Sequence, residues 1–141
     1  MRKHPRALEA EGITPERYAE LRAVCRQYPG HVRYLRLVRS GLEERPERRR
    51  GRSGVWKKPD PTGNAAAYVA DRTAWESSRV QLIEGCARAV AVAAVVPALI
   101  ECVTEERGYD ILRHRPPCGR QAFYRTRLLF FILLDARLRA M

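Results

Sequence analysis

The segment Gly108–Leu134, which reads GYDILRHRPPCGRQAFYRTRLLFFILL, decides the fold expected for this chain. Tyr109–Leu112 predicts a brief helix. The Pro116–Pro117 pair prevents its continuation, because each proline lacks a backbone donor and disfavours helical geometry in the residue before it. A final helix is expected from near Gly119 to about Leu138. The chain therefore ends in a short helix, a tight turn and a long helix.

Upstream of this segment the pattern is also helical. Residues 96–106 predict a helix, and Arg107–Gly108 predicts the turn that follows it. The motif DPTGN at 60–64 precedes a long amphipathic helix with a seven-residue apolar repeat, at Tyr68, Trp75, Leu82 and Ala89. Such a stripe forms either an internal core seam or a coiled-coil dimer seam. Arginines beside the stripe favour the core.

The N-terminal part predicts two helices that form a hairpin over residues 14–42. Thr14 suits an N-cap and Pro15 the first helical position. The first helix is expected to end at Pro29–Gly30, and the second at Ser40–Gly41.

The fold class is therefore all-α, because no segment alternates convincingly with period two. We expect an N-terminal helical hairpin at 1–42, a basic flexible linker at 43–63, and a helical domain at 64–141. The domain is expected to end in a trihelical, helix-turn-helix-like unit. The linker interpretation rests on the loss of apolar periodicity after Leu42.

The charge indicates a polyanionic or acidic partner. Twenty-seven basic and sixteen acidic residues give a net charge of +11 and a pI near 10.3. Arginines outnumber lysines 24 to 3, a ratio that either coding bias or a need for forked phosphate and guanine contacts explains.

The sequence gives little support for a metal site, for catalysis or for a membrane span. Cys102, His114 and Cys118 could converge on a metal, but their spacing is not that of a paired-ligand site, and we expect no metal or cofactor. Glycine-rich phosphate loops, HExxH pairs and GxSxG elbows do not occur, so we expect no enzyme. The longest uncharged apolar run, Ala89–Ile100, has 12 residues, whereas a membrane span needs roughly 20. With a charged rather than signal-like start, the chain is expected in a reducing cytoplasm.

The final helix carries the candidate DNA contacts. Residues 113–127 hold five arginines and no acid, at a helix start that is already partly positive, so a bound phosphate would relieve the repulsion. Glu101, Glu105 and Glu106, by contrast, are interpreted as solvated helix charges. The candidate contact residues in this segment are Arg113, Arg115, Arg120, Gln121, Tyr124, Arg125 and Arg127, and those in the linker are Arg48, Arg49, Arg50 and Arg52.

The order of motifs DPTGN, a long helix, GYDIL, PPCGR, FYRTR and LLFFILL resembles phage late-gene regulators of the ArpU type, over roughly residues 60–138. The resemblance implies a sigma-factor-like helix-turn-helix that binds double-stranded DNA in a bacterial host cytoplasm. It also implies Tyr109–Leu112 as the scaffold helix and Arg120, Gln121, Tyr124 and Arg125 as the reading residues. Regulators commonly bind two half-sites, which favours a homodimer.

Two other functions fit the same sequence. One is a helical protein-interaction module that binds an acidic host or phage protein, such as RNA polymerase, or a second copy of itself. The other is a phage packaging or structural component that holds DNA without choosing its sequence. Salt dependence and preference for a specific duplex would separate these classes.

Overall fold

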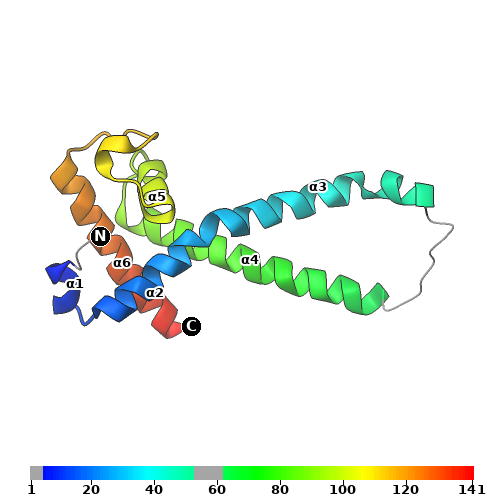
Figure 1. Ribbon diagram of the computed structural model, residues 1–141, viewed down its shortest axis with the longest axis horizontal. Coiled ribbons are helices and arrows are strands. Elements are labelled where there is room, and N and C mark those ends of the chain that lie inside the picture. Colours follow the sequence, from blue (N-terminus) through cyan, green and yellow to red (C-terminus); the bar gives the residue numbers. More distant parts are fainter. Residues whose placement is uncertain (1–4, 53–61) are drawn as a thin grey trace. The chain divides into compact units, whose positions relative to one another are not determined.

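The computed structural model describes the backbone of residues 5–52 and 62–141, and the side chains of residues 5–41 and 66–141. Within this part of the chain every regular element is helical, which confirms the all-α expectation (Figure 1). The elements are α1 (Arg6–Ala10), α2 (Pro15–Arg26), α3 (Tyr28–Arg52), α4 (Thr62–Val90), α5 (Val96–Glu105), a short 3-10 helix η1 (Tyr109–Ile111) and α6 (Arg120–Ala140). None of the helices described has both the length and the apolarity needed to cross a bilayer.

The chain divides into two compact units. Unit 1 comprises Met1–Pro29 and Gln81–Met141, and unit 2 comprises Gly30–Val80. These boundaries differ from those expected at 42 and 63, because α3 continues to Arg52 and α4 begins at Thr62. The residues from 43 to 52, expected as linker, are mostly Glu and Arg, which are good helix formers.

The first two long helices also end at other residues than the sequence predicts. Pro29 lies in the first turn of α3 and does not end α2. Proline is tolerated there because a first-turn N–H has no acceptor within the helix. Gly41 stays inside α3 without a positive φ, at a cost of about 1 kcal/mol relative to alanine. The helices α2 and α3 thus belong largely to different units, and they do not form the separate hairpin domain expected at 14–42.

The start of α2 is as expected. The Thr14 side chain accepts a hydrogen bond from the backbone N–H of Arg17 at 3.1 Å, and Pro15 occupies the first helical position. Tyr18, Leu21 and Cys25, three and four residues apart, are the buried residues of this helix and lie along one side of it.

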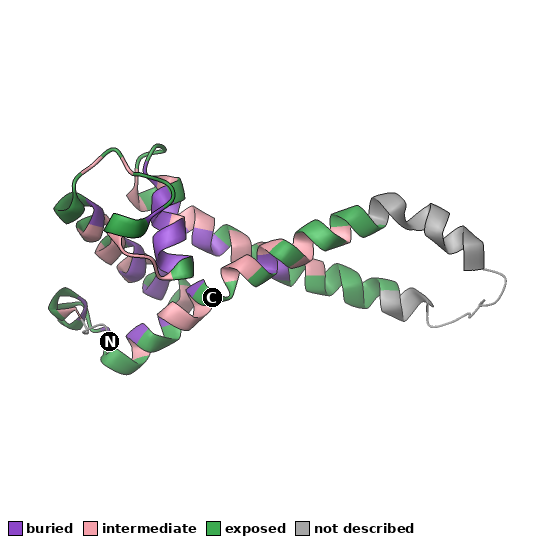
Figure 2. Ribbon diagram, turned by 45° about the horizontal axis from the view of Figure 1, so that its top comes forward, coloured by how far each residue is buried: buried purple, intermediate pink, exposed green. Residues whose placement is uncertain are grey.

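The apolar core lies in unit 1, where α6 packs against α1, α2 and α5 (Figure 2). In the second half of α6, Phe130, Phe131 and Leu134 are buried, all at most 1% exposed, whereas Leu129 is 49% exposed. The seven-residue stripe of α4 divides between the two units. Its C-terminal part contributes buried Leu82 to unit 1, whereas Tyr68 and Trp75 are exposed in unit 2.

Candidate nucleic-acid interface

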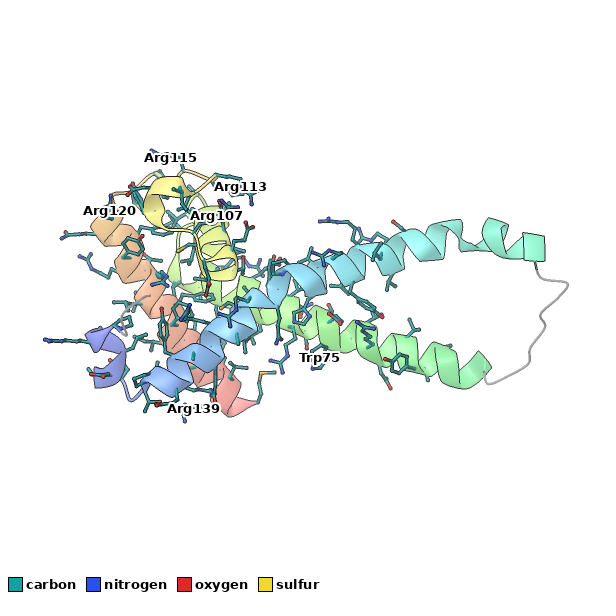
Figure 3. The ribbon with its side chains drawn as sticks, viewed as in Figure 1. Trp75, Arg107, Arg113, Arg115, Arg120 and Arg139 are labelled. Atoms are coloured by element: carbon teal, nitrogen blue, oxygen red, sulfur yellow. The ribbon has the colours of Figure 1, made fainter. Side chains whose placement is uncertain are left out.

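The basic segment predicted from the sequence spans η1, the loop of residues 112–119 and the first turns of α6. Figure 3 labels Arg113 and Arg115 in this loop and Arg120 at the start of α6. The short helix expected at Tyr109–Leu112 is present as the three-residue η1. Some arginines of this segment form ion pairs with carboxylates, and others have no ion pair in the described part of the chain.

Glu101, on the second turn of α5, is the buried acid that holds the loop. Its carboxylate is 2% exposed and accepts hydrogen bonds from the backbone N–H groups of Arg113 and His114, at 2.9–3.0 Å. His114 Nδ1 also lies 2.9 Å from Glu101 Oε1. Burial alone would raise the pKa of Glu101, but these hydrogen bonds outweigh it and lower the pKa to about 2. A charged carboxylate thus fixes the loop to α5.

The same acid also binds the side chain of Arg113, which is 61% exposed. Its guanidinium lies 3.4 Å from the Glu101 carboxylate and donates to Glu105 at 2.9 Å. Arg107 pairs with the same two carboxylates. The interpretation of Glu101 as a solvated helix charge is wrong, since the helix turns this side chain toward the loop.

Arg120 has an acidic partner as well, but an exposed one. Its guanidinium donates to both carboxylate oxygens of Asp110 at 2.8 Å, and the two side chains are 56% and 65% exposed. The guanidinium also lies 5.6 Å from the centre of the Tyr109 ring. Exposed ion pairs contribute about 0–1 kcal/mol, so a phosphate could replace Asp110 at little cost.

Two side chains on the same face of α6 as Arg120 bind other parts of unit 1: those of Tyr124 and Arg127. The Tyr124 hydroxyl accepts from the backbone N–H of Tyr109 at 2.8 Å. Arg127 is half-buried, donates to the Tyr18 hydroxyl at 3.1 Å, and lies 5.3 Å from the centre of the Phe131 ring. These two side chains therefore face the protein, and neither belongs to the exposed surface expected from the sequence.

The neighbouring face of α6 is the exposed one. Gln121 and Arg125, one helical turn apart, are exposed, with the small Ala122 beside them. Arg115 in the preceding loop is exposed too. In the described part of the chain none of these three polar side chains has a hydrogen bond or ion pair. The first turn of α6 contains no acid, and its N-cap, Gly119, provides no side-chain acceptor.

Two further carboxylates in unit 1 are occupied by arginines of α2. Glu106 accepts from Arg22 at 2.9 Å and from Arg26 at 3.0 Å, so it is not a solvated charge either. Asp135 accepts from Arg17 at 2.6 Å and is also bound by Arg139. Burial opposes the charge of both acids, but the arginines lower each pKa.

The sequence predicts the position of the basic segment, but not which carboxylates pair with its arginines. Asp110 could have been paired with Arg120, because only a tight turn separates them in the sequence. No local pattern places Glu101 on the backbone twelve residues later. The remaining candidates lie outside the described side chains: Arg48, Arg49, Arg50 and Arg52.

The described residues show no cluster of three metal-ligating side chains, so Cys102, His114 and Cys118 do not form one. No disulfide involves any of the four cysteines, and Cys25, Cys86 and Cys102 are buried. Burial raises the pKa of the Cys25 thiol, which keeps it protonated.

The segment from α5 to α6 is thus a basic surface. Arg115, Gln121 and Arg125 are exposed there without a partner in the described part of the chain, and Arg113 and Arg120 are exposed but paired with carboxylates. Comparison of the chain with known protein families, with curated proteins and with solved structures finds no match.

Proposed function

We propose that the protein binds double-stranded DNA through the exposed residues at the start of α6. The observation that carries this proposal is the set of two unpaired arginines, Arg115 and Arg125, beside a helix N-terminus without an acid. Backbone N–H groups and guanidinium groups at such a position favour phosphate.

The side chains of the exposed face suit base contacts in the major groove. Arginine pairs with the O6 and N7 atoms of guanine, and glutamine with the N6 and N7 atoms of adenine. Gln121 and Arg125 lie one turn apart on α6, and Ala122 between them leaves room for close approach. Arg115 and Arg120 would contact the phosphates that flank these bases.

The finer part of the proposal is regulation of phage or prophage transcription in a bacterial cytoplasm. It rests on the sequence resemblance to ArpU-type regulators. The geometry restricts the reading residues to a smaller set than the resemblance implies, because Tyr124 is bonded to the backbone of Tyr109. RNA polymerase contact and dimer formation remain parts of this proposal.

The test is duplex binding by alanine variants, measured by fluorescence anisotropy across salt concentrations. Arg115→Ala, at a proposed phosphate contact, is expected to weaken binding about tenfold and to reduce the salt slope by about one. Arg125→Ala, at a proposed base contact, is expected to weaken binding about tenfold and to reduce the preference for a selected sequence. Arg139→Ala is the matched control, because it removes the same charge near the other end of α6 and is expected to change affinity little. Gln121→Ala should leave binding to random duplex unchanged and reduce the preference for a selected sequence.

Equal loss of affinity in Arg139→Ala and Arg125→Ala, with circular dichroism showing intact helices in both, would reject the α6 interface. A preference for selected over random duplex below about a thousandfold would reject a sequence-specific regulator and favour a packaging role.

A further inference from the structure

Unit 2 is a helical hairpin that has no apolar core among its described residues. The only buried side chains there are His31 on α3 and Glu76 on α4, which are joined by a 2.6 Å contact between His31 Nδ1 and Glu76 Oε1. Arg72 donates to the second oxygen of Glu76 at 3.1 Å. Burial would raise the pKa of Glu76, but its hydrogen bonds to His31 and Arg72 lower it. The described contacts between α3 and α4 are thus polar and aromatic, and the rings of Tyr68 and Trp75 keep a large exposed area.

One flank of α4 presents aromatic rings and guanidinium groups in alternation. Tyr68, Arg72, Trp75 and Arg79 follow one another at spacings of four, three and four residues, which places them along one side of the helix. Tyr68 is 64% exposed and Trp75, labelled in Figure 3, is 48% exposed. At 1.5 Å per residue the two aromatic positions are about 10 Å apart along the helix.

Each guanidinium group lies over an aromatic ring of the same unit. Arg72 is 4.2 Å from the centre of the Tyr34 ring, on α3, and Arg79 is 5.3 Å from the centre of the Trp75 ring. Trp75 also meets the His31 ring edge-on at 5.3 Å. These contacts hold the charged and aromatic groups in fixed positions on one face that includes part of α3.

Unit 2 has an excess of basic residues. Between residues 30 and 80 the sequence has twelve basic and six acidic residues. Among the residues of unit 2 whose side chains are described, the acids are Asp71, which is exposed, and Glu76, which is buried and paired. The exposed described cations are all arginines: Arg33, Arg36 and Arg39 on α3, and Arg72 on α4.

We infer that this flank binds single-stranded DNA, with unpaired bases on Tyr68 and Trp75 and phosphates on Arg72 and Arg79. A partner helix would have to bury both guanidinium groups in order to cover the two rings. A second copy of the hairpin would bring the same arginines together. A nucleic acid strand supplies both partners at once, a flat base for each ring and a phosphate for each guanidinium.

The described polar groups of the flank favour DNA over RNA. Selection of RNA requires donors or acceptors directed at the 2′-hydroxyl. Two hydroxyls of α4 are engaged within the protein, since Ser78 donates to the Trp75 carbonyl at 2.7 Å and Thr73 lies 3.4 Å from the Tyr34 hydroxyl. The site is therefore expected to bind a DNA strand at least as well as an RNA strand. It is separate from the α6 interface and does not depend on duplex binding there.

The test uses the full chain and a labelled fifteen-nucleotide oligo(dT), with Kd measured by fluorescence anisotropy. Trp75→Ala and Tyr68→Ala are each expected to weaken binding about five- to hundredfold, the range for loss of one stacked base. Trp75→Phe keeps a ring and should stay within about threefold of the parent chain. Val92→Ala, at an equally exposed apolar side chain of unit 1, is the matched control and should leave Kd unchanged.

Tyr68→Ala keeps the test valid if Trp75→Ala loosens the hairpin, because Tyr68 is the more exposed ring. Arg125→Ala should weaken duplex binding more than oligo(dT) binding, and Trp75→Ala should do the reverse. Failure of the first comparison rejects the duplex interface, and failure of the second rejects the single-strand site.

Three other results would overturn the inference. The first is oligo(U) binding at least tenfold tighter than oligo(dT). The second is sedimentation showing a dimer that Trp75→Ala or Tyr68→Ala dissociates. The third is a synthetic Glu- and Leu-rich amphipathic helix that binds at lower Kd than oligo(dT) and loses affinity in the same two variants.

Discussion

At Glu101, one carboxylate accepts hydrogen bonds from the backbone N–H groups of Arg113 and His114 and so joins α5 to the loop before α6. The loop would otherwise have two unsatisfied N–H groups beside a buried acid, which is costly in a low-dielectric interior. Glu101 also binds the Arg113 side chain, so Arg115 is the arginine of this loop without an ion pair in the described part of the chain. Single acids thus determine which exposed arginines are already paired.

The stability of unit 1 should fall in acid because of this residue. The pKa of Glu101 is about 2 in the folded protein and about 4.5 ordinarily. Its contribution is therefore fully present above about pH 4.5 and is lost as the pH falls toward 2, by about 3 kcal/mol in total. Urea unfolding at a series of pH values should show this decline, and Glu101→Gln should flatten it. The control is Glu105→Gln, an exposed acid whose loss should leave the decline in place.

At the scale of the element, the end of α5 is made by an unusual residue. Glu106 has a positive φ of 55°, in the left-handed region where glycine is favoured, and its carboxylate binds Arg22 and Arg26. A glutamate in this conformation costs roughly 1 kcal/mol relative to glycine. The ion pairs to α2 explain why the strain is retained, because they attach the end of α5 to a second helix.

Two substitutions at this position separate the strain from the ion pairs. Glu106→Ala and Glu106→Gly both lose the contacts to the two arginines, but only alanine keeps the strained backbone. We expect Glu106→Gly to be more stable than Glu106→Ala by about 1 kcal/mol in chemical denaturation. Equal stability of the two variants would contradict this account of how α5 ends.

At the scale of the whole molecule, burial is unequal between the two units. Unit 1 contains the entire described apolar core, including Leu99, Phe123 and Phe130, whereas unit 2 buries only His31 and Glu76 among its described residues. Apolar burial is the main favourable term in folding, so the two units should differ in local stability.

Native-state hydrogen exchange should reveal this difference. Backbone amides of residues 66–80 are expected to exchange faster than those of residues 97–104 and 123–134, because fewer apolar contacts oppose opening of the hairpin. Mass spectrometry of peptides from each segment provides the measurement, with oligo(dT) added in a second series. Equal protection of the segments without ligand would show that unit 2 has stabilising contacts beyond those described.

The sequence by itself determined the helical class and the start of α2 at Thr14. These features depend on local periodicity and capping, which the order of residues carries directly. It also located the basic segment at the start of α6. The core favoured for the seven-residue stripe of α4 does not form at Tyr68 and Trp75, which are exposed.

Only the tertiary structure decided which arginines are paired with acids. Glu101 lies on α5, twelve residues before Arg113, and no local pattern pairs the two, whereas Asp110 on η1 is separated from Arg120 only by the turn before α6. The direction in which each face of α6 points is likewise set by packing against α2 and α5. Long-range contacts fix how α6 is rotated about its own axis, which the periodicity of a single helix does not determine.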